Sequence, residues 1–209
     1  MTATYIKKSP RQNSITVLAV HAKCGINSFN HSLAGSAVPV SVAHRLAKKN
    51  TATVILSVRD PFLRLLSAWR QFTVKPLQQH STVVPRMQRD QLSQWTQFLG
   101  KHKQYRNKPI AEWCRFLNST WPERLCGSDP HFQSQSEAYT GWFKHPHVGC
   151  HSINNICKHF GFTPRHANQG VWPWPDLTVD DFRVQDAVTV VNRLYCDDLE
   201  LFSASREHP

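Results

Sequence analysis

Two short apolar runs in the first third of the chain each pass directly into a helix-like pattern. The first run covers residues 16–21 and the second covers residues 54–58. Near-continuous apolar runs of this length are typical of parallel strands that are buried on both faces. After the second run, apolar residues recur at helical spacing, which predicts one buried helix face made of Phe62, Leu65, Leu66, Trp69 and Phe72. The pattern predicts a three-layer α/β fold, with a mostly parallel central sheet flanked by helices.

The remaining segments fit a single domain with further predicted strands and helices. With 209 residues, the chain has a suitable length for a single domain, 1–209. Residues 1–13 are polar and basic, which predicts a flexible arm. Residues 37–43 are predicted to form a second strand, and Pro39 restricts this strand to a sheet edge, or itself to the strand start. Residues 150–160 predict a helix that closes at Gly161. A final helix is expected after Thr178.

The loop after the first run has the composition of an anion-binding site. Residues 22–27 predict a tight loop that contains Lys23 and Gly25, and Ser28 begins a helical segment. The free N–H groups and the positive end of a helix attract a phosphate-like group, to which Lys23 adds a full charge. The loop is not a Walker A sequence, because no Gly-Lys-Ser/Thr follows a first glycine at the required spacing.

A second candidate anion site follows the second run. Arg59 stands where that strand should end, and Pro61 fits the first turn of a helix, where its missing N–H costs nothing. Arg59 and Ser67 are placed to converge on one phosphate from the strand end and the helix. Ligands of open α/β sheets bind outside the carboxyl ends of the strands, where Lys23 and Arg59 are both expected.

These segments resemble the sulfotransferases that use 3′-phosphoadenosine 5′-phosphosulfate (PAPS), nearest the carbohydrate sulfotransferase branch. That family has a Lys-x-Gly-x-Thr-Ser-like loop after its first strand, which is matched here by Lys23-Cys24-Gly25-Ile26-Asn27-Ser28. It also has an Arg-Asp-Pro-x-x-Arg-x-x-Ser block, matched by Arg59, Asp60, Pro61, Arg64 and Ser67. Near its C-terminus the family has Tyr-x-x-Asp-x-x-x-Phe, matched by Tyr195, Asp198 and Phe202. The resemblance covers roughly residues 14–202, and its middle part is poorly matched.

The resemblance implies a P-loop-like domain in which residues 16–73 are the nucleotide-binding core. Sulfuryl would pass from PAPS to an acceptor hydroxyl by in-line displacement, leaving 3′-phosphoadenosine 5′-phosphate (PAP). The expected donor-binding residues are Lys23, Cys24, Gly25, Ile26, Asn27, Ser28, Arg59 and Ser67. Lys23 is also expected to be catalytic, because it would stabilise the negative charge that develops on the leaving 5′-phosphate oxygen.

The chain departs from the family pattern at the general base. Relatives often place a Gly-His-x-Ser/Thr arrangement where this chain has residues 38–41, and His44 follows three residues later. Histidine titrates near neutral pH and suits proton removal, so His44 is the first candidate, with His21 and His131 as alternatives. A group of His and Cys residues between His145 and His159 matches no zinc-ligand spacing, and no metal site is predicted from it.

Charge and composition restrict the partners. The formal net charge is +11, which favours anionic partners such as a nucleotide or an acidic glycan. We expect a hydroxyl-bearing acceptor, plausibly a carbohydrate. No stretch approaches the roughly 20 apolar residues of a membrane span and no signal peptide is evident, so a cytoplasmic location is expected. Two alternatives are a basic nucleic-acid-binding protein, which would lack a recognisable binding motif, and a nucleotide-binding phosphotransferase-like protein.

Overall fold

The fold is seen in a computed structural model that describes residues 2–9, 14–21, 24, 29, 32–49, 52–69, 73, 102–105, 108–120, 132–163, 183 and 185–207. Its strands are β1 (Thr2–Ser9), β2 (Ser14–His21), β3 (Ala37–Val38), β4 (Ala52–Val58) and β5 (Val148–Ser152). A short 3-10 helix, η1 (Ala34–Ser36), precedes β3. The α-helices are α2 (Val40–Ala47), α3 (Pro61–Trp69), α5 (Ile110–Thr120), α6 (Gln135–Tyr139), α7 (Ile153–Phe160), α8 (Gln185–Leu194) and α9 (Cys196–Glu207).

The five strands form one sheet in the order β3-β1-β2-β4-β5. β2, β4 and β5 are parallel neighbours, whereas β1 is antiparallel to β2 and to β3. The register pairs Val17 with Val54 and Val20 with Ser57, so β2 and β4 end side by side. The predicted α/β architecture, with its mostly parallel sheet and its two apolar central strands, is therefore confirmed.

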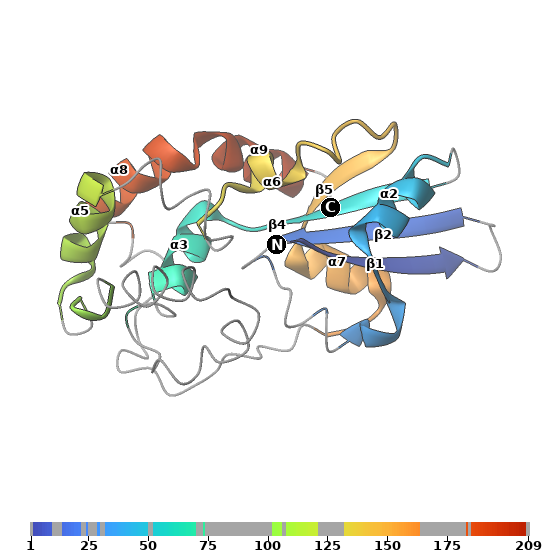
Figure 1. Ribbon diagram of the computed structural model, residues 1–209, viewed down its shortest axis with the longest axis horizontal. Coiled ribbons are helices and arrows are strands. Elements are labelled where there is room, and N and C mark those ends of the chain that lie inside the picture. The colour runs from blue at the N-terminus through green and yellow to red at the C-terminus, as the bar shows by residue number, and fades with distance from the viewer. Residues whose placement is uncertain are drawn as a thin grey trace, which may run out of the picture.

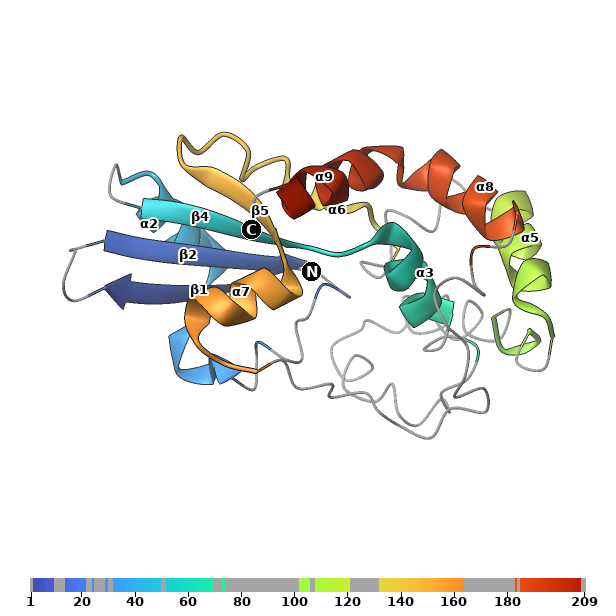
Figure 2. The same cartoon turned by 180° about the vertical axis from the view of Figure 1, so that it is seen from behind.

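Helices cover both faces of this sheet. Successive side chains of a strand point to opposite faces, so the apolar residues of β2 and β4 need packing partners on each side. Val17 and Leu56 pack on one face with residues of α2 and α9, while Leu18 and Ile55 pack on the other face with residues of α7. Figures 1 and 2 show α2 and α7 on opposite sides of the strands. This three-layer packing makes the interior of β2 and β4 almost fully buried.

A second apolar cluster lies beyond the carboxyl ends of the parallel strands. The chain leaves β4 and enters α3 at Pro61, and α3 packs with α5 and α8 (Figure 1). The centre of this cluster includes Leu65, Trp113 and Val190, all at most 2% exposed. The predicted apolar face of α3 is therefore a real core face, although Phe72 lies outside the described residues.

The N-terminal segment differs from its sequence prediction. Residues 1–13 were expected to form a flexible arm, but Thr2–Ser9 is strand β1, which pairs with β2 along its whole length. Tyr5 of β1 is fully buried against Phe29 and the face of the sheet that α7 covers. Thr4 and Tyr5 are both buried while Lys7 and Lys8 are both exposed, so β1 has no strict period of two, and its burial comes from pairing with β2 and β3.

Three other segments differ in part from their predictions. The strand expected over residues 37–43 is limited to Ala37–Val38, because Pro39 caps helix α2 instead. The helix expected over residues 150–160 begins only at Ile153, since Val148–Ser152 is β5, but it does end at Gly161 with a φ of 77°. The C-terminal helix is two helices, α8 and α9, separated at Tyr195.

None of the helices in the described parts of the chain has the length and apolar character needed to cross a membrane.

Candidate functional site

The candidate site lies where β2 and β4 end next to each other. The loop expected to bind the 5′-phosphosulfate follows β2, and Arg59 follows β4 directly. Of the loop residues, Cys24 is described, while Lys23, Gly25, Ile26, Asn27 and Ser28 lie outside the described residues. Because β2 and β4 are parallel neighbours, Cys24 and Arg59 both lie at the same edge of the sheet.

Tyr139, at the end of α6, fastens these two strand ends to each other. Its hydroxyl accepts a hydrogen bond from the His21 N–H at 2.8 Å and donates one to the Ser57 carbonyl at 2.7 Å. The side chain is fully buried, and burial raises the pKa of Tyr139 well above its ordinary value. The phenol therefore stays protonated and keeps its donor.

Cys24 is held from both sides by neighbours at the same edge. Its carbonyl accepts a 2.7 Å hydrogen bond from the Ser57 hydroxyl, and its thiol donates to Gln135 Oε1 at 2.9 Å. Burial raises the pKa of the Cys24 thiol to about 11, while the nearby Arg64 and Arg59 charges oppose that rise. The thiol is therefore a neutral hydrogen-bond donor at pH 7, and its contacts fix the position of Cys24 after β2.

Gln135 holds the backbone of Arg59 through both ends of its side-chain amide. Gln135 Oε1 accepts from the Arg59 N–H at 2.8 Å, and Gln135 Nε2 donates to the Arg59 carbonyl at 2.9 Å. The side chain is fully buried, and the same amide also receives the Cys24 thiol. Gln135 thus connects the loop after β2 with the residue that follows β4.

Asp198 of α9 occupies the amino-terminal end of α6. Its carboxylate accepts hydrogen bonds from the Gln135 N–H at 2.8 Å and from the Ser136 N–H at 2.9 Å. The first N–H groups of a helix lack intrahelical partners and carry partial positive charge, so a carboxylate there satisfies and stabilises them. The Ser136 hydroxyl adds a further bond at 3.1 Å.

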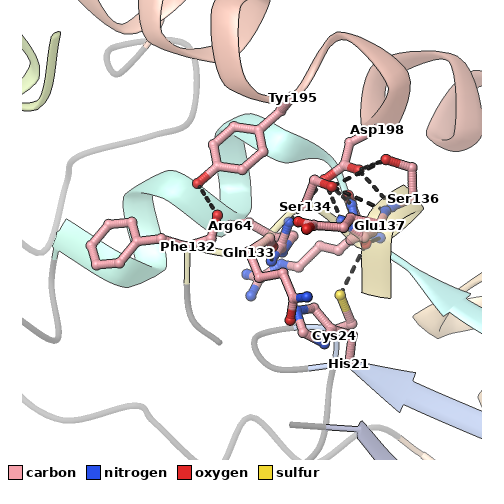
Figure 3. Close-up of polar contacts among 12 residues, drawn as sticks. His21, Cys24, Arg64, Phe132, Gln133, Ser134, Ser136, Glu137, Tyr195 and Asp198 are labelled. Atoms are coloured by element: carbon pink, nitrogen blue, oxygen red, sulfur yellow. Dashed lines mark hydrogen bonds and ion pairs between the residues drawn. The ribbon is translucent and has the colours of Figure 1, made fainter. Parts of the chain in front are cut away.

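Arg64 of α3 completes this buried group by pairing with Asp198. The two charged groups approach to 2.9 Å, with side-chain exposures of 2% and 0%. Arg64 also donates to the Gln133 carbonyl at 2.7 Å, and the Tyr195 ring lies 5.6 Å from its guanidinium carbon. Figure 3 shows Arg64, Asp198 and Cys24 approaching the start of α6 from three different segments. We call Cys24, Arg64, Gln135 and Asp198 the linking network.

Sequence reasoning matched Arg64 and Asp198 to family blocks but did not predict that they pair, and it gave no role to Gln135. One signal was present for the pair. Arg64 stands among the apolar residues of α3, and a buried arginine requires an anionic partner. No comparable local signal identifies Gln135, since a polar residue at the start of a short helix is more often exposed.

The start of α3 is fixed by Asp60. Its carboxylate accepts a 2.8 Å bond from the Phe62 N–H and forms an ion pair with Arg183 at 3.2 Å. The Arg183 guanidinium also lies over the Phe62 ring, 4.3 Å from the ring centre. Ser67 lies one turn beyond Arg64 on the same helix and is partly exposed. Arg59 and Ser67 thus flank the first two turns of α3.

His44 lies away from Arg59 and Cys24, as its contacts with Trp142 and His145 show. Its ring stacks on Trp142 with the centroids 3.7 Å apart, and its Nδ1 is 3.1 Å from Nε2 of His145. His145 lies just before β5, whose first residue pairs with Val54, five residues before Arg59. At about 3.3 Å per residue, this is roughly 16 Å along the strand. Figure 1 likewise shows α2 over the half of the sheet away from α3.

Burial lowers the pKa values of both His44 and His145, and the neighbouring Lys48 charge lowers them further. The lowered pKa values favour neutral rings at pH 7, and the hydrogen bond between the two imidazoles requires the accepting nitrogen to be unprotonated. Of the alternatives for the base, His21 is fully buried at the end of β2, and His131 lies outside the described residues. Among the described residues, no three potential metal ligands come together.

Taken together, these contacts hold Arg59 and Cys24 in a fixed relation at one sheet edge. Such an edge can present backbone N–H groups and basic side chains to an anionic ligand. Comparison of the chain with protein-family models, with curated proteins and with solved structures finds no match of any of the three kinds. A function is therefore inferred from the residues and contacts of this chain.

We expect Asp198→Asn to destabilise the fold by about 3–5 kcal/mol, because it leaves the Arg64 charge buried without its anionic partner. Urea unfolding of Asp198→Asn, Arg64→Met and the double variant measures the cost. The double variant should lose less than the sum of the single losses, since both remove the same interaction.

The matched control for this cycle is Glu112→Gln, which breaks the exposed Lys108–Glu112 pair at 3.3 Å. Exposed helix pairs contribute only about 0.3–0.5 kcal/mol, so this variant should be nearly neutral. Equal losses for Asp198→Asn and Glu112→Gln would contradict the structural importance of the buried pair.

Proposed function

We propose that the chain is a PAPS-dependent sulfotransferase with a P-loop-like nucleotide site, acting on an acceptor hydroxyl. One observation carries this proposal. The three segments with family-like sequence, around Cys24, Arg59–Ser67 and Tyr195–Phe202, are joined by the linking network at the carboxyl ends of β2 and β4. These segments lie far apart in the sequence, and they meet at the edge where open α/β folds bind ligands.

The proposed donor-binding residues belong to the two segments that come after β2 and β4 in the sequence. The loop of Lys23, Cys24, Gly25, Ile26, Asn27 and Ser28 would hold the 5′-phosphosulfate through backbone N–H groups, the Ser28 hydroxyl and the Lys23 charge. Arg59 and Ser67 would hold the 3′-phosphate by charge and hydrogen bond. A second phosphate anchor distinguishes PAPS from ordinary nucleotides, and Arg59 has its backbone fixed by Gln135.

The proposed chemistry exchanges one S–O bond for another. The acceptor oxygen attacks sulfur as the bond from sulfur to the 5′-phosphate oxygen breaks, and a base takes the acceptor proton. PAPS supplies the activated sulfuryl group. Lys23 would stabilise the growing charge on the leaving oxygen, and this effect favours the transition state over the ground state. PAP is then the released product.

The identity of the base is the part of the proposal that the structure changes most. A general base must approach the proton that it removes to within hydrogen-bond distance. His44 instead stacks on Trp142 and bonds to His145 near the start of β5. These contacts favour a packing role for His44, so the proposal does not depend on it as the base.

An acidic acceptor, plausibly a sulfated or carboxylated glycan, agrees with the net charge of +11. The same charge would suit a nucleic-acid-binding protein, and the strand–loop–helix arrangement would suit a phosphotransferase-like protein. These two alternatives are separated from the proposal by their ligands, because neither requires a 3′-phosphate on the nucleotide.

We expect PAP to raise the melting temperature of the protein more than ATP or a DNA oligomer does. Arg59→Ala should weaken PAP binding by roughly tenfold to a hundredfold, since a charged hydrogen bond contributes about 1.5–3 kcal/mol. Binding of adenosine 5′-phosphosulfate, which lacks the 3′-phosphate, should change much less. Ser67→Ala should show the same selectivity with a smaller loss.

The control for nonspecific charge effects is Arg45→Ala, which removes an exposed cation from α2. It should leave the affinities for both nucleotides within about threefold, because exposed charges are screened. Stabilisation by ATP or DNA that exceeds the effect of PAP would refute the proposed function.

Lys23→Ala should lower kcat by roughly a hundredfold or more while PAP still binds measurably. The reason is that Lys23 would interact most strongly with charge that appears only in the transition state. Single-turnover rates with labelled PAPS, together with PAP titration, separate the two effects. Lys49→Ala, at an exposed position after α2, is the charge-matched control. A pure loss of PAP affinity in Lys23→Ala would remove its catalytic role.

His44→Phe should keep kcat within about threefold, because phenylalanine preserves an aromatic stack on Trp142 and His44 is placed by packing contacts. The measurement is the rate of transfer to a sugar hydroxyl, with the melting temperature recorded for the same sample. A loss of about a hundredfold or more in kcat, with an unchanged melting temperature, would instead assign the base role to His44.

A further inference from the structure

Gln135 is a residue that contacts both halves of the proposed donor site. Its single side-chain amide touches Cys24 in the loop after β2, Arg59 after β4 and Asp198 in α9. The side chain is fully buried, so these contacts are protected from competition with water.

The hydrogen bonds of the amide use both of its atoms. Oε1 accepts from the Cys24 thiol at 2.9 Å and from the Arg59 N–H at 2.8 Å. Nε2 donates to the Arg59 carbonyl at 2.9 Å and to Asp198 Oδ2 at 3.3 Å. Because the Arg59 backbone is held at both its N–H and its carbonyl, its rotation about the strand axis is restricted.

The position of Gln135 is itself determined by the buried ion pair. Asp198 accepts the Gln135 N–H at 2.8 Å, and Arg64 holds that carboxylate at 2.9 Å. The amide therefore projects from a helix end that is fixed by a charged group, toward both strand ends. A side chain held in this way can define the distance between two neighbouring binding segments.

We propose that Gln135 is a positioning residue that sets the spacing between Cys24, in the segment proposed to bind the 5′-phosphate, and Arg59, which is proposed to bind the 3′-phosphate. The inference rests on the proposed function and deepens it. A nucleotide with both phosphates requires the two segments at one separation, whereas a nucleotide with one phosphate requires only one segment. Loss of Gln135 should therefore weaken binding of the doubly phosphorylated ligand most.

The test compares the affinities of four ligands: adenosine, AMP, 3′-AMP and PAP. In the wild-type protein PAP should bind most tightly, since both phosphates are engaged together. Gln135→Met keeps a similar length and removes every hydrogen bond of the amide. This variant should bind PAP roughly tenfold more weakly, because two or more hydrogen bonds that align Arg59 and the loop are lost. Its affinities for AMP and 3′-AMP should change by less than about threefold.

A second variant allows for a folding defect in Gln135→Met. Gln135→Asn keeps the amide but is shorter by one methylene group, so it cannot reach the Arg59 N–H and carbonyl as Gln135 does. It should show the same selective loss of PAP affinity. The control is Thr4→Val, which removes a buried 2.6 Å hydrogen bond to Val38 at the β1–β3 edge. That control should lower stability and leave all four affinities unchanged.

The outcomes separate the two proposals. A selective loss of PAP affinity in both Gln135 variants supports the positioning role. If PAP binds the wild type more tightly than AMP or 3′-AMP, and both variants keep that advantage, the positioning role is refuted while the proposed function stands. If the wild type shows no preference for PAP over the singly phosphorylated nucleotides, both proposals fail together.

Discussion

The buried ion pair between Arg64 and Asp198 is the interaction on which the rest of the candidate site depends. The two groups meet at 2.9 Å with almost no exposure to solvent. Removing two charges from water costs several kcal/mol per ion, which is recovered only when the pair has good geometry and additional hydrogen bonds. Here Asp198 also receives two backbone N–H groups of α6, and Arg64 donates to the Gln133 carbonyl.

The Arg64–Asp198 pair also determines where helix α6 lies. Arg64 belongs to the helix after β4, and Asp198 belongs to α9, which packs beside β5. Their contact holds α6 by its amino-terminal end, and α6 in turn supplies Gln135 and Tyr139 to the ends of β2 and β4. The position of Cys24 relative to Arg59 is therefore set by contacts from Gln135, more than 70 positions later in the chain. The placement of Cys24 next to Arg59 is therefore a property of this tertiary arrangement.

The sequence predicted the parts of this structure that depend on local patterning. The two central strands follow from continuous apolar runs, and the buried face of α3 follows from its helical period. The N-terminal strand was missed because polar residues, including Thr4, Lys7 and Lys8, interrupt any apolar run in it. Pairing with β2 provides the burial that local propensity does not.

The candidate site was predictable to a similar extent. Arg59 and the loop of Cys24 could be selected as candidates because helix starts and strand ends have recognisable residues, and their binding role stays a prediction. Gln135 was missed because its role comes from three contacts with distant segments, each of which exists only in the folded chain. His44 was selected by its chemistry, but its stack on Trp142 depends on how the segment before β5 crosses the sheet. Long-range packing of this kind has no local sequence signal.

The central claim is that the edge formed by the ends of β2 and β4 holds a nucleotide with both a 3′- and a 5′-phosphate. A crystal structure of the protein with PAP tests it most directly. We predict the 3′-phosphate within hydrogen-bond distance of the Arg59 guanidinium and the Ser67 hydroxyl, and the 5′-phosphate against the loop of residues 23–28. PAP bound at another surface, or bound at this edge with its 3′-phosphate in solvent, would contradict the claim.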